Sequence, residues 1–149
     1  YTFSVVVADI EIDLETGKIA VQRITAADDI GVNVNPLLSE GQAQGGIIQA
    51  LGLSLYERLV LDRGQAVTGN FADYTLPRAE GMPGMDTIAV ESKEALGPFG
   101  AKSAAETAID SAAAAVSNAV YDAVGVRMNS LPITPQLLLA RIRQRMEDL

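Results

Sequence analysis

Hydrophobic and polar residues alternate at the start of the chain in a pattern that predicts a β-hairpin. Residues 3–12 are rich in valine and isoleucine and alternate clearly from Val7 to Ile12, and a second alternating run covers residues 19–26. A turn that contains Gly17 separates the two runs. Period-two alternation on both sides of a glycine-containing turn is typical of two antiparallel strands with one buried face.

A long helix is predicted next, over residues 37–57. Apolar residues recur there every three or four positions, which places them on one helical face. Asn35 suits the N-cap and Pro36 the first helical position, so residues 28–36 are expected to form the preceding loop. The helix contains four glycines at 41, 45, 46 and 52, which indicates a close neighbour against its backbone.

The middle of the chain carries weaker signals. Residues 59–61 and 87–91 are predicted as short strands, and a turn follows the first of them at residues 62–65. The segment 69–85 is rich in glycine and proline and is expected to be irregular, and residues 97–100 predict a tight loop.

Helical periodicity returns in the last third. Small and branched apolar residues recur from residue 104 to residue 124, and Gly125 stands where a C-terminal cap belongs. Pro135 opens a last helix, in which we expect Leu137, Leu138, Ile142 and Met146 to face inward. The predicted class is α+β, with the hairpin and a small irregular sheet packed against two long helices and a C-terminal helix.

Composition excludes several kinds of chemistry. The 149 residues fit one domain or one lobe of a larger one, and they include no cysteine and no histidine. Cysteine-ligated iron–sulfur clusters, thiol nucleophiles and serine–histidine–aspartate triads are therefore impossible within this chain, and proton transfer falls to Asp, Glu, Lys or Tyr. The net charge of −8 argues against nucleic-acid binding, and no apolar run is long enough to span a membrane. Because Tyr1 opens the chain without an initiator Met or a signal-peptide pattern, we expect a fragment of a longer polypeptide.

The stretch from Gly100 to Glu106 has two interpretations. A loop of small residues runs directly into a helix start, where free backbone N–H groups could bind an anion. The spacing of Ser103 and Glu106 equally matches a capping box, and capping boxes are far commoner than catalytic bases. On spacing alone, capping is the favoured reading.

Two other polar clusters are also ambiguous. Ser39 and Gln42 share capping-box spacing, while a glutamine within a glycine-rich stretch can also hydrogen-bond the edge of a heterocycle. Asp28 and Asp29 could bind a cation. With no third carboxylate nearby in the sequence, solvation in a loop or helix capping is the expected role.

Five collinear segments resemble the end of the molybdenum-binding subunit of the xanthine dehydrogenase/aldehyde oxidase family. They are VADIEIDLETGKIAVQRI, DIGVNVNPLLSEGQAQGGIIQALGLSLYE, NFADYTLP, GPFGAKSAAE and AVSNAVYDAVGVRMNSLPITPQLLL. One such motif would be weak, but five in order cover nearly the whole chain. The resemblance implies that residues 1–149 form the C-terminal lobe of a molybdopterin-binding domain.

The resemblance also implies roles for particular residues. The family hydroxylates N-heterocycles (purine-like compounds) and aldehydes with water as the oxygen source. Its catalytic glutamate, the general base, corresponds to Glu106, and Gln42 corresponds to the glutamine that contacts the pterin. The residues that line the cofactor correspond to Lys102, Ser103, Ala104 and Ala105, and no residue here corresponds to a protein ligand of the metal. The family usually has glycine where this chain has Ser103, Ala105 and Ala50.

The cofactor implied is a molybdopterin carrying molybdenum, often as the cytosine dinucleotide in bacteria. Electrons would leave through iron–sulfur centres, and in some enzymes FAD, on other subunits or domains. The expected partners are therefore the remainder of the molybdenum subunit, an iron–sulfur subunit or domain, an FAD subunit where one exists, and a small-molecule substrate. We expect a cytoplasmic enzyme whose fragment alone is inactive. The alternative is a non-catalytic structural or interaction domain in which Glu106 and Gln42 are helix caps.

Overall fold

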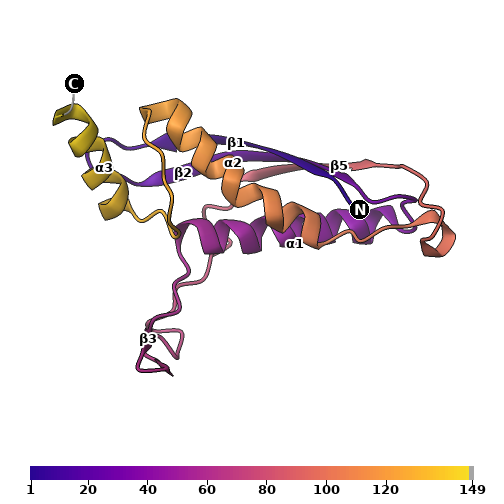
Figure 1. The fold of residues 1–149 in the computed structure, drawn as a ribbon, viewed down its shortest axis with the longest axis horizontal. Helices are drawn as coiled ribbons and strands as arrows, with labels where there is room; N and C mark the ends of the chain where they lie inside the picture. Colours follow the sequence, from indigo (N-terminus) through magenta and orange to yellow (C-terminus); the bar gives the residue numbers. More distant parts are fainter. Residues whose placement is uncertain (148–149) are drawn as a thin grey trace.

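The computed structural model describes residues 1–147, which form an α+β fold around one small sheet (Figure 1). The sheet contains three strands in the order β1-β2-β5, and the helices α1 and α2 run along its inner face, with α3 near one end. This arrangement confirms the predicted class. The bounds are β1 Ser4–Ile12, β2 Ile19–Asp29, α1 Pro36–Leu55, β5 Gly84–Val90, α2 Glu106–Val124 and α3 Pro135–Glu147.

The predicted hairpin forms, and its second strand is longer than expected. β1 and β2 pair antiparallel from Ser4↔Asp28 to Ile12↔Ile19, with one irregularity between Asp9 and Ile10. β2 also pairs with β5 in parallel, from Arg23↔Gly84 to Asp29↔Val90. The prediction that Asp28 and Asp29 belong to a loop was therefore wrong, because pairing with a distant strand extends β2 to Asp29.

The core lies between the inner face of the sheet and the two long helices. Ile24 on β2, Ile47 on α1 and Val116 and Val120 on α2 are fully buried. Alternation on the strands and the three-to-four spacing on the helices bring these side chains together, as the hydrophobic pattern predicts. Buried residues of α3 and of the preceding segment, Leu138 and Ile133, close one end of the same cluster.

Local signals position the ends of the helices. α1 begins at Pro36, and the Asn35 side chain accepts a hydrogen bond from the N–H of Leu38 at 3.2 Å, so both predicted cap residues are confirmed. Gly125 ends α2 in the left-handed conformation, with φ of 65°. In α3, Leu138 is buried and Leu137 and Ile142 pack against the core. The inward position expected for Met146 was wrong: this residue is 71% exposed.

Two short strand predictions need revision. The strand expected at residues 59–61 is displaced to Leu61–Asp62 (β3), which pairs only with Gln65–Ala66 (β4). This exposed hairpin projects away from the rest of the fold (Figure 1). The strand expected at residues 87–91 begins three residues earlier, at Gly84, because β2 offers it a longer edge. Within residues 1–147, no helix is both long and apolar enough to cross a membrane.

Candidate functional site

The segment that precedes α2 is fastened to the end of β2 by backbone hydrogen bonds. The Lys102 N–H donates to the Ile30 carbonyl at 2.8 Å, and the Val32 N–H donates to the Gly100 carbonyl at 2.8 Å. Gly31 forms an antiparallel bridge with Ala101. Gly31 has φ of 68°, and a Cβ there would collide with the Gly100 carbonyl, so the approach of the two segments requires glycine at this position.

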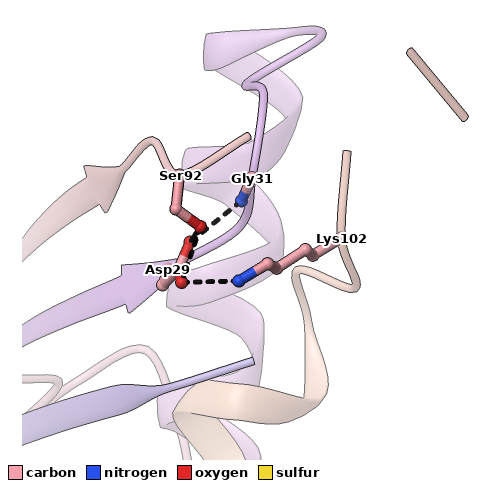
Figure 2. Close-up of polar contacts among 4 residues, drawn as sticks. All are labelled: Asp29, Gly31, Ser92 and Lys102. Atoms are coloured by element: carbon pink, nitrogen blue, oxygen red, sulfur yellow. Dashed lines mark hydrogen bonds and ion pairs between the residues drawn. The ribbon is translucent and has the colours of Figure 1, made fainter. Parts of the chain in front are cut away.

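A nearly buried ion pair lies beside this bridge. Lys102 Nζ is 2.7 Å from Asp29 Oδ2, and the two side chains are only 11% and 14% exposed. The Ser92 hydroxyl donates to Asp29 Oδ1 at 2.6 Å, and the Gly31 N–H reaches the same oxygen at 3.2 Å (Figure 2). The hydrogen bond from Lys102, and then that from Ser92, hold the pKa of Asp29 well below its usual range. Asp29 is therefore an ionised carboxylate with donors on both oxygens.

This network was absent from the sequence-based prediction. Asp29 was expected to be solvated in a loop or to cap a helix, while Lys102 was singled out through its place in a motif. Their ion pair joins residues 73 positions apart, and no local pattern links them. The side chain of Lys102 is turned toward the end of β2 and lies 5.8 Å from the centre of the Phe3 ring.

Glu106 is the first residue of α2, and its carboxylate is exposed to solvent. The Ser103 hydroxyl donates a hydrogen bond to Glu106 Oε2 at 2.5 Å. That bond is the largest cause of a lowered pKa for Glu106, and backbone N–H groups at the start of α2 add to it. Burial opposes them less strongly, so Glu106 is ionised at neutral pH.

The capping box predicted for Ser103 and Glu106 does not form. The N-cap of α2 is Ala105, no side chain caps the helix, and Ser103 bonds the carboxylate of Glu106 in place of a backbone N–H. Residues 103–105 precede the helix, which begins only at Glu106, so Glu106 is not at the third helical position that a capping box requires. Glu106 is thus an acidic residue in the first turn of α2, and it does not form the predicted capping box with Ser103.

The capping box predicted for Ser39 and Gln42 is also absent. Ser39 lies inside α1, where its hydroxyl bonds Asn33 Oδ1 at 2.8 Å and the Asn35 carbonyl at 2.9 Å. The N-cap is Asn35, and the side chain of Gln42 is exposed. Neither of the two capping boxes that the sequence spacing favoured is therefore present.

Gln42 lies on the side of α1 that meets the segment before α2. One helical turn after Gln42, Gly46 packs so closely that a Cβ there would be 2.7 Å from the Ala105 carbonyl oxygen. Residues four apart share a helix face, so Gln42 stands one turn from this contact on a neighbouring part of the α1 surface. A Cβ added at Gly41 or Gly45 would have no neighbouring side chain or other segment within 4 Å, so the backbone of α1 is uncovered beside Gln42.

A neighbouring cavity of about 190 Å³ lies between α1, the inner face of β5 and Ala104. Its lining includes Asp28, which is buried and has Oδ1 without a hydrogen-bond partner, but it does not include Gln42 or Glu106. The site residues that the resemblance implies, Gln42 and residues 102–106, therefore meet this cavity only at Ala104. Among residues 1–147, no group of three or more acidic side chains is arranged to hold a metal ion.

Comparisons with known proteins identify the family of the chain. Residues 1–83 match the family described as the molybdopterin cofactor-binding domain. The chain is 37% identical over 145 residues to the 6-hydroxypseudooxynicotine dehydrogenase complex subunit gamma of Paenarthrobacter nicotinovorans, covering 95% of this chain and 18% of that protein. It is 36% identical to a putative xanthine dehydrogenase molybdenum-binding subunit of Escherichia coli, covering 91% of this chain and 18% of that protein.

The fold is similar to a solved structure of the same kind. The aldehyde oxidoreductase of Desulfovibrio gigas superposes with a TM-score of 0.86 at 30% identity, covering 95% of this chain and 15% of that one. The chain therefore spans less than a fifth of the length of the relatives that it matches.

Proposed function

Because this chain belongs to the molybdopterin cofactor-binding domain family, we propose that it is the C-terminal lobe of the molybdenum subunit in a hydroxylase of the xanthine dehydrogenase/aldehyde oxidase type. The substrate class is an N-heterocycle or an aldehyde, oxidised with water as the oxygen source. The similar proteins described above are named for 6-hydroxypseudooxynicotine, xanthine and aldehyde, and these names support this range of substrates. Residues 1–149 alone supply only part of the site and are inactive.

The residues present fit a bound molybdopterin. The N-cap of α2 is Ala105, which makes no side-chain cap, and the preceding Ser103 and Ala104 are also small. Across from them, α1 leaves its backbone open at Gly45, next to the exposed amide of Gln42. The backbone of residues 103–105, beyond the Lys102 N–H that bonds Ile30, and the side chain of Gln42 would hold the cofactor by hydrogen bonds. When bound, the molybdenum cofactor supplies the two-electron redox chemistry.

The role of this chain in the reaction is to accept a proton at Glu106. Hydroxylation by water requires a base to remove a proton as the new carbon–oxygen bond forms, and Glu106 is ionised before the reaction begins. The Ser103 hydroxyl occupies Oε2, so we assign the proton to Oε1. The observation that carries the proposal is the ionised carboxylate of Glu106 at the start of α2. The residue before it, Ala105, packs against Gly46 of α1, the helix that also carries Gln42.

Further groups complete the proposed enzyme. Because the chain has no cysteine, iron–sulfur centres that carry electrons away belong to another subunit or domain, together with FAD where the enzyme uses it. The gamma-subunit name of one similar protein supports a multisubunit assembly. We propose the cytosine dinucleotide form of the cofactor and a cytoplasmic location as parts of the same hypothesis.

The experiment is purification of the full-length subunit together with the products of its neighbouring genes, followed by elemental analysis. We expect about one molybdenum per subunit, iron in the complex, cytidine nucleotide after acid release, and reduction by at least one of xanthine, quinoline and benzaldehyde. A fully folded complex without molybdenum would contradict the proposal and favour a structural or interaction domain.

A further inference from the structure

The segment that carries Glu106 is tied to the sheet at one residue, Lys102, by both backbone and side chain. The backbone N–H of Lys102 bonds the Ile30 carbonyl. Its ammonium group bonds Asp29 at the end of β2, as Figure 2 shows. Beyond Lys102, residues 103–105 are neither helix nor strand, and α2 begins at Glu106. Lys102 is therefore the last residue before the proposed base that bonds the end of β2 through both its backbone and its side chain.

Asp29, which binds the Lys102 ammonium group, is itself held in place by its neighbours. Asp29 lies at the last register position of β2, opposite Val90, and its carboxylate is held by Ser92, Gly31 and Lys102. Ser92 follows β5, so the carboxylate connects three separate segments of the chain. A carboxylate with donors on both oxygens has little freedom to rotate, so it fixes the position of the ammonium group that it binds.

Burial distinguishes this ion pair from an ordinary surface pair. The Lys102 and Asp29 side chains are 11% and 14% exposed, whereas those of Arg23 and Asp86, which form another short ion pair at 2.6 Å, are 59% and 52% exposed. Removing one partner of a nearly buried pair leaves the other charge without compensation, while exposed pairs contribute little. Loss of Asp29 therefore leaves the Lys102 ammonium group nearly buried without its partner, and Arg23 offers a matched control.

We propose that Lys102 and Asp29 are positioning residues, whose ion pair sets the location of residues 103–106 and hence of the Glu106 carboxylate. This inference rests on the proposed function of Glu106 as the base. Neither side chain contacts the reacting atoms: the ammonium group of Lys102 is directed into the protein toward β2, and only the backbone beyond it lines the site. Displacement of a reacting group by about 1 Å costs up to about 100-fold in rate, so the ion pair affects turnover without taking part in it.

The first test measures the position of the segment directly. Hydrogen exchange of peptides covering residues 100–110 is followed by mass spectrometry in the full-length, molybdenum-loaded enzyme and in its Lys102→Met, Asp29→Asn and Arg23→Met variants. We expect exchange about tenfold faster in the first two variants and unchanged in the third, because only the first two release the segment. Unchanged exchange in Lys102→Met would overturn the inference.

The second test asks whether the effect acts through Glu106. The rate of enzyme reduction by a substrate of the wild-type enzyme is measured for Lys102→Met, Glu106→Gln and the double variant, with molybdenum content in each. We expect Lys102→Met to slow reduction by about 10- to 100-fold alone, and to add nothing in the Glu106→Gln background. An additional loss of the same size in that background would show an effect independent of Glu106 and would contradict the inference.

Two milder variants keep the test informative if Lys102→Met does not fold. Lys102→Arg retains the charge and should recover most of the rate, and Ser92→Ala keeps the ion pair but removes one donor, so its effect should be smaller. Wild-type rates in both Ser92→Ala and Asp29→Asn would overturn the positioning role. A normal rate in Glu106→Gln would instead refute the proposed base, and the hydrogen-exchange result would still decide whether the ion pair holds the segment.

Discussion

The carbonyl oxygen of Ala105 lies 2.7 Å from the point where a Cβ on Gly46 would stand. This approach brings the middle of α1 against the residue that precedes the proposed base. Because carbonyl oxygen and carbon cannot come so close without a shift, only glycine at position 46 permits the observed packing. The helix that carries Gln42 and the segment that carries Glu106 are thereby packed against each other.

Replacement of Gly46 by alanine should displace the start of α2. The added methyl group must push Ala105 away, and overpacking of this kind costs about 1–3 kcal/mol, partly offset by a gain of about 1 kcal/mol in helix propensity. We expect a lower midpoint of urea unfolding and slower reduction of the loaded full-length enzyme.

Gly45→Ala is the matched control, since it makes the same change one residue earlier in α1, where nothing lies within 4 Å. It should stabilise the protein by up to about 1 kcal/mol through helix propensity alone. Equal effects of the two substitutions on unfolding would show that the contact with Ala105 has no energetic consequence.

Ser103→Ala should change the pH dependence of reduction. The Ser103 hydroxyl is the largest cause of the lowered pKa of Glu106, so its removal raises that pKa toward the usual value of a glutamate. A base works only when deprotonated, so the acid limb of the pH–rate profile should move to higher pH, with the rate near neutral pH nearly unchanged. A profile that stays in place would indicate that Glu106 does not control the acid limb.

Asp29→Asn should alter stability in acid in a defined direction. The pKa of Asp29 is lower in the folded protein than the value of about 3.9 expected when unfolded, so its ion pair stabilises the fold fully above that pH. This contribution is lost as the pH falls below about 4 toward the folded-state pKa. Urea unfolding between pH 7 and pH 2.5 should therefore show the wild type losing stability more steeply than Asp29→Asn, with the curves converging. Parallel curves would contradict the assigned role of the ion pair.

The elements that sequence predicts well here are those with local causes. Asn35 and Pro36 define the start of α1 by capping and by a preset φ, and Gly125 ends α2 because it adopts a left-handed conformation. The two strands of the hairpin were also predictable, because each buries one face and so alternates apolar and polar residues. Helical periodicity gave a wrong prediction at Met146. This residue keeps the spacing of the inward-facing residues of α3, but it lies beyond the part of the helix that packs against the core and is exposed.

The parts that sequence could not predict depend on contacts between distant residues. The parallel pairing of β2 with β5 lengthens β2 and turns Asp29 from an expected loop residue into the end of a strand. Its partner Lys102 is 73 residues away, so the ion pair has no local signature. Capping-box spacing at Ser103 and Glu106 was also misleading, since α2 begins at Glu106 itself with Ala105 as its N-cap. Glu106 and Gln42 were singled out by family resemblance, and their catalytic and cofactor-binding roles stay predictions.

The most direct test of the central proposal compares Glu106→Gln with the wild type in the full-length, molybdenum-loaded enzyme. Glutamine keeps the size and an oxygen acceptor for Ser103 but removes the base. Molybdenum content and the rate of anaerobic reduction by substrate are measured on the same preparations. We predict full molybdenum occupancy, a nearly unchanged melting temperature and reduction slower by about 10²- to 10⁴-fold, the range typical of general-base loss. Full molybdenum occupancy with a near-normal rate of reduction would contradict the assignment of Glu106 as the base.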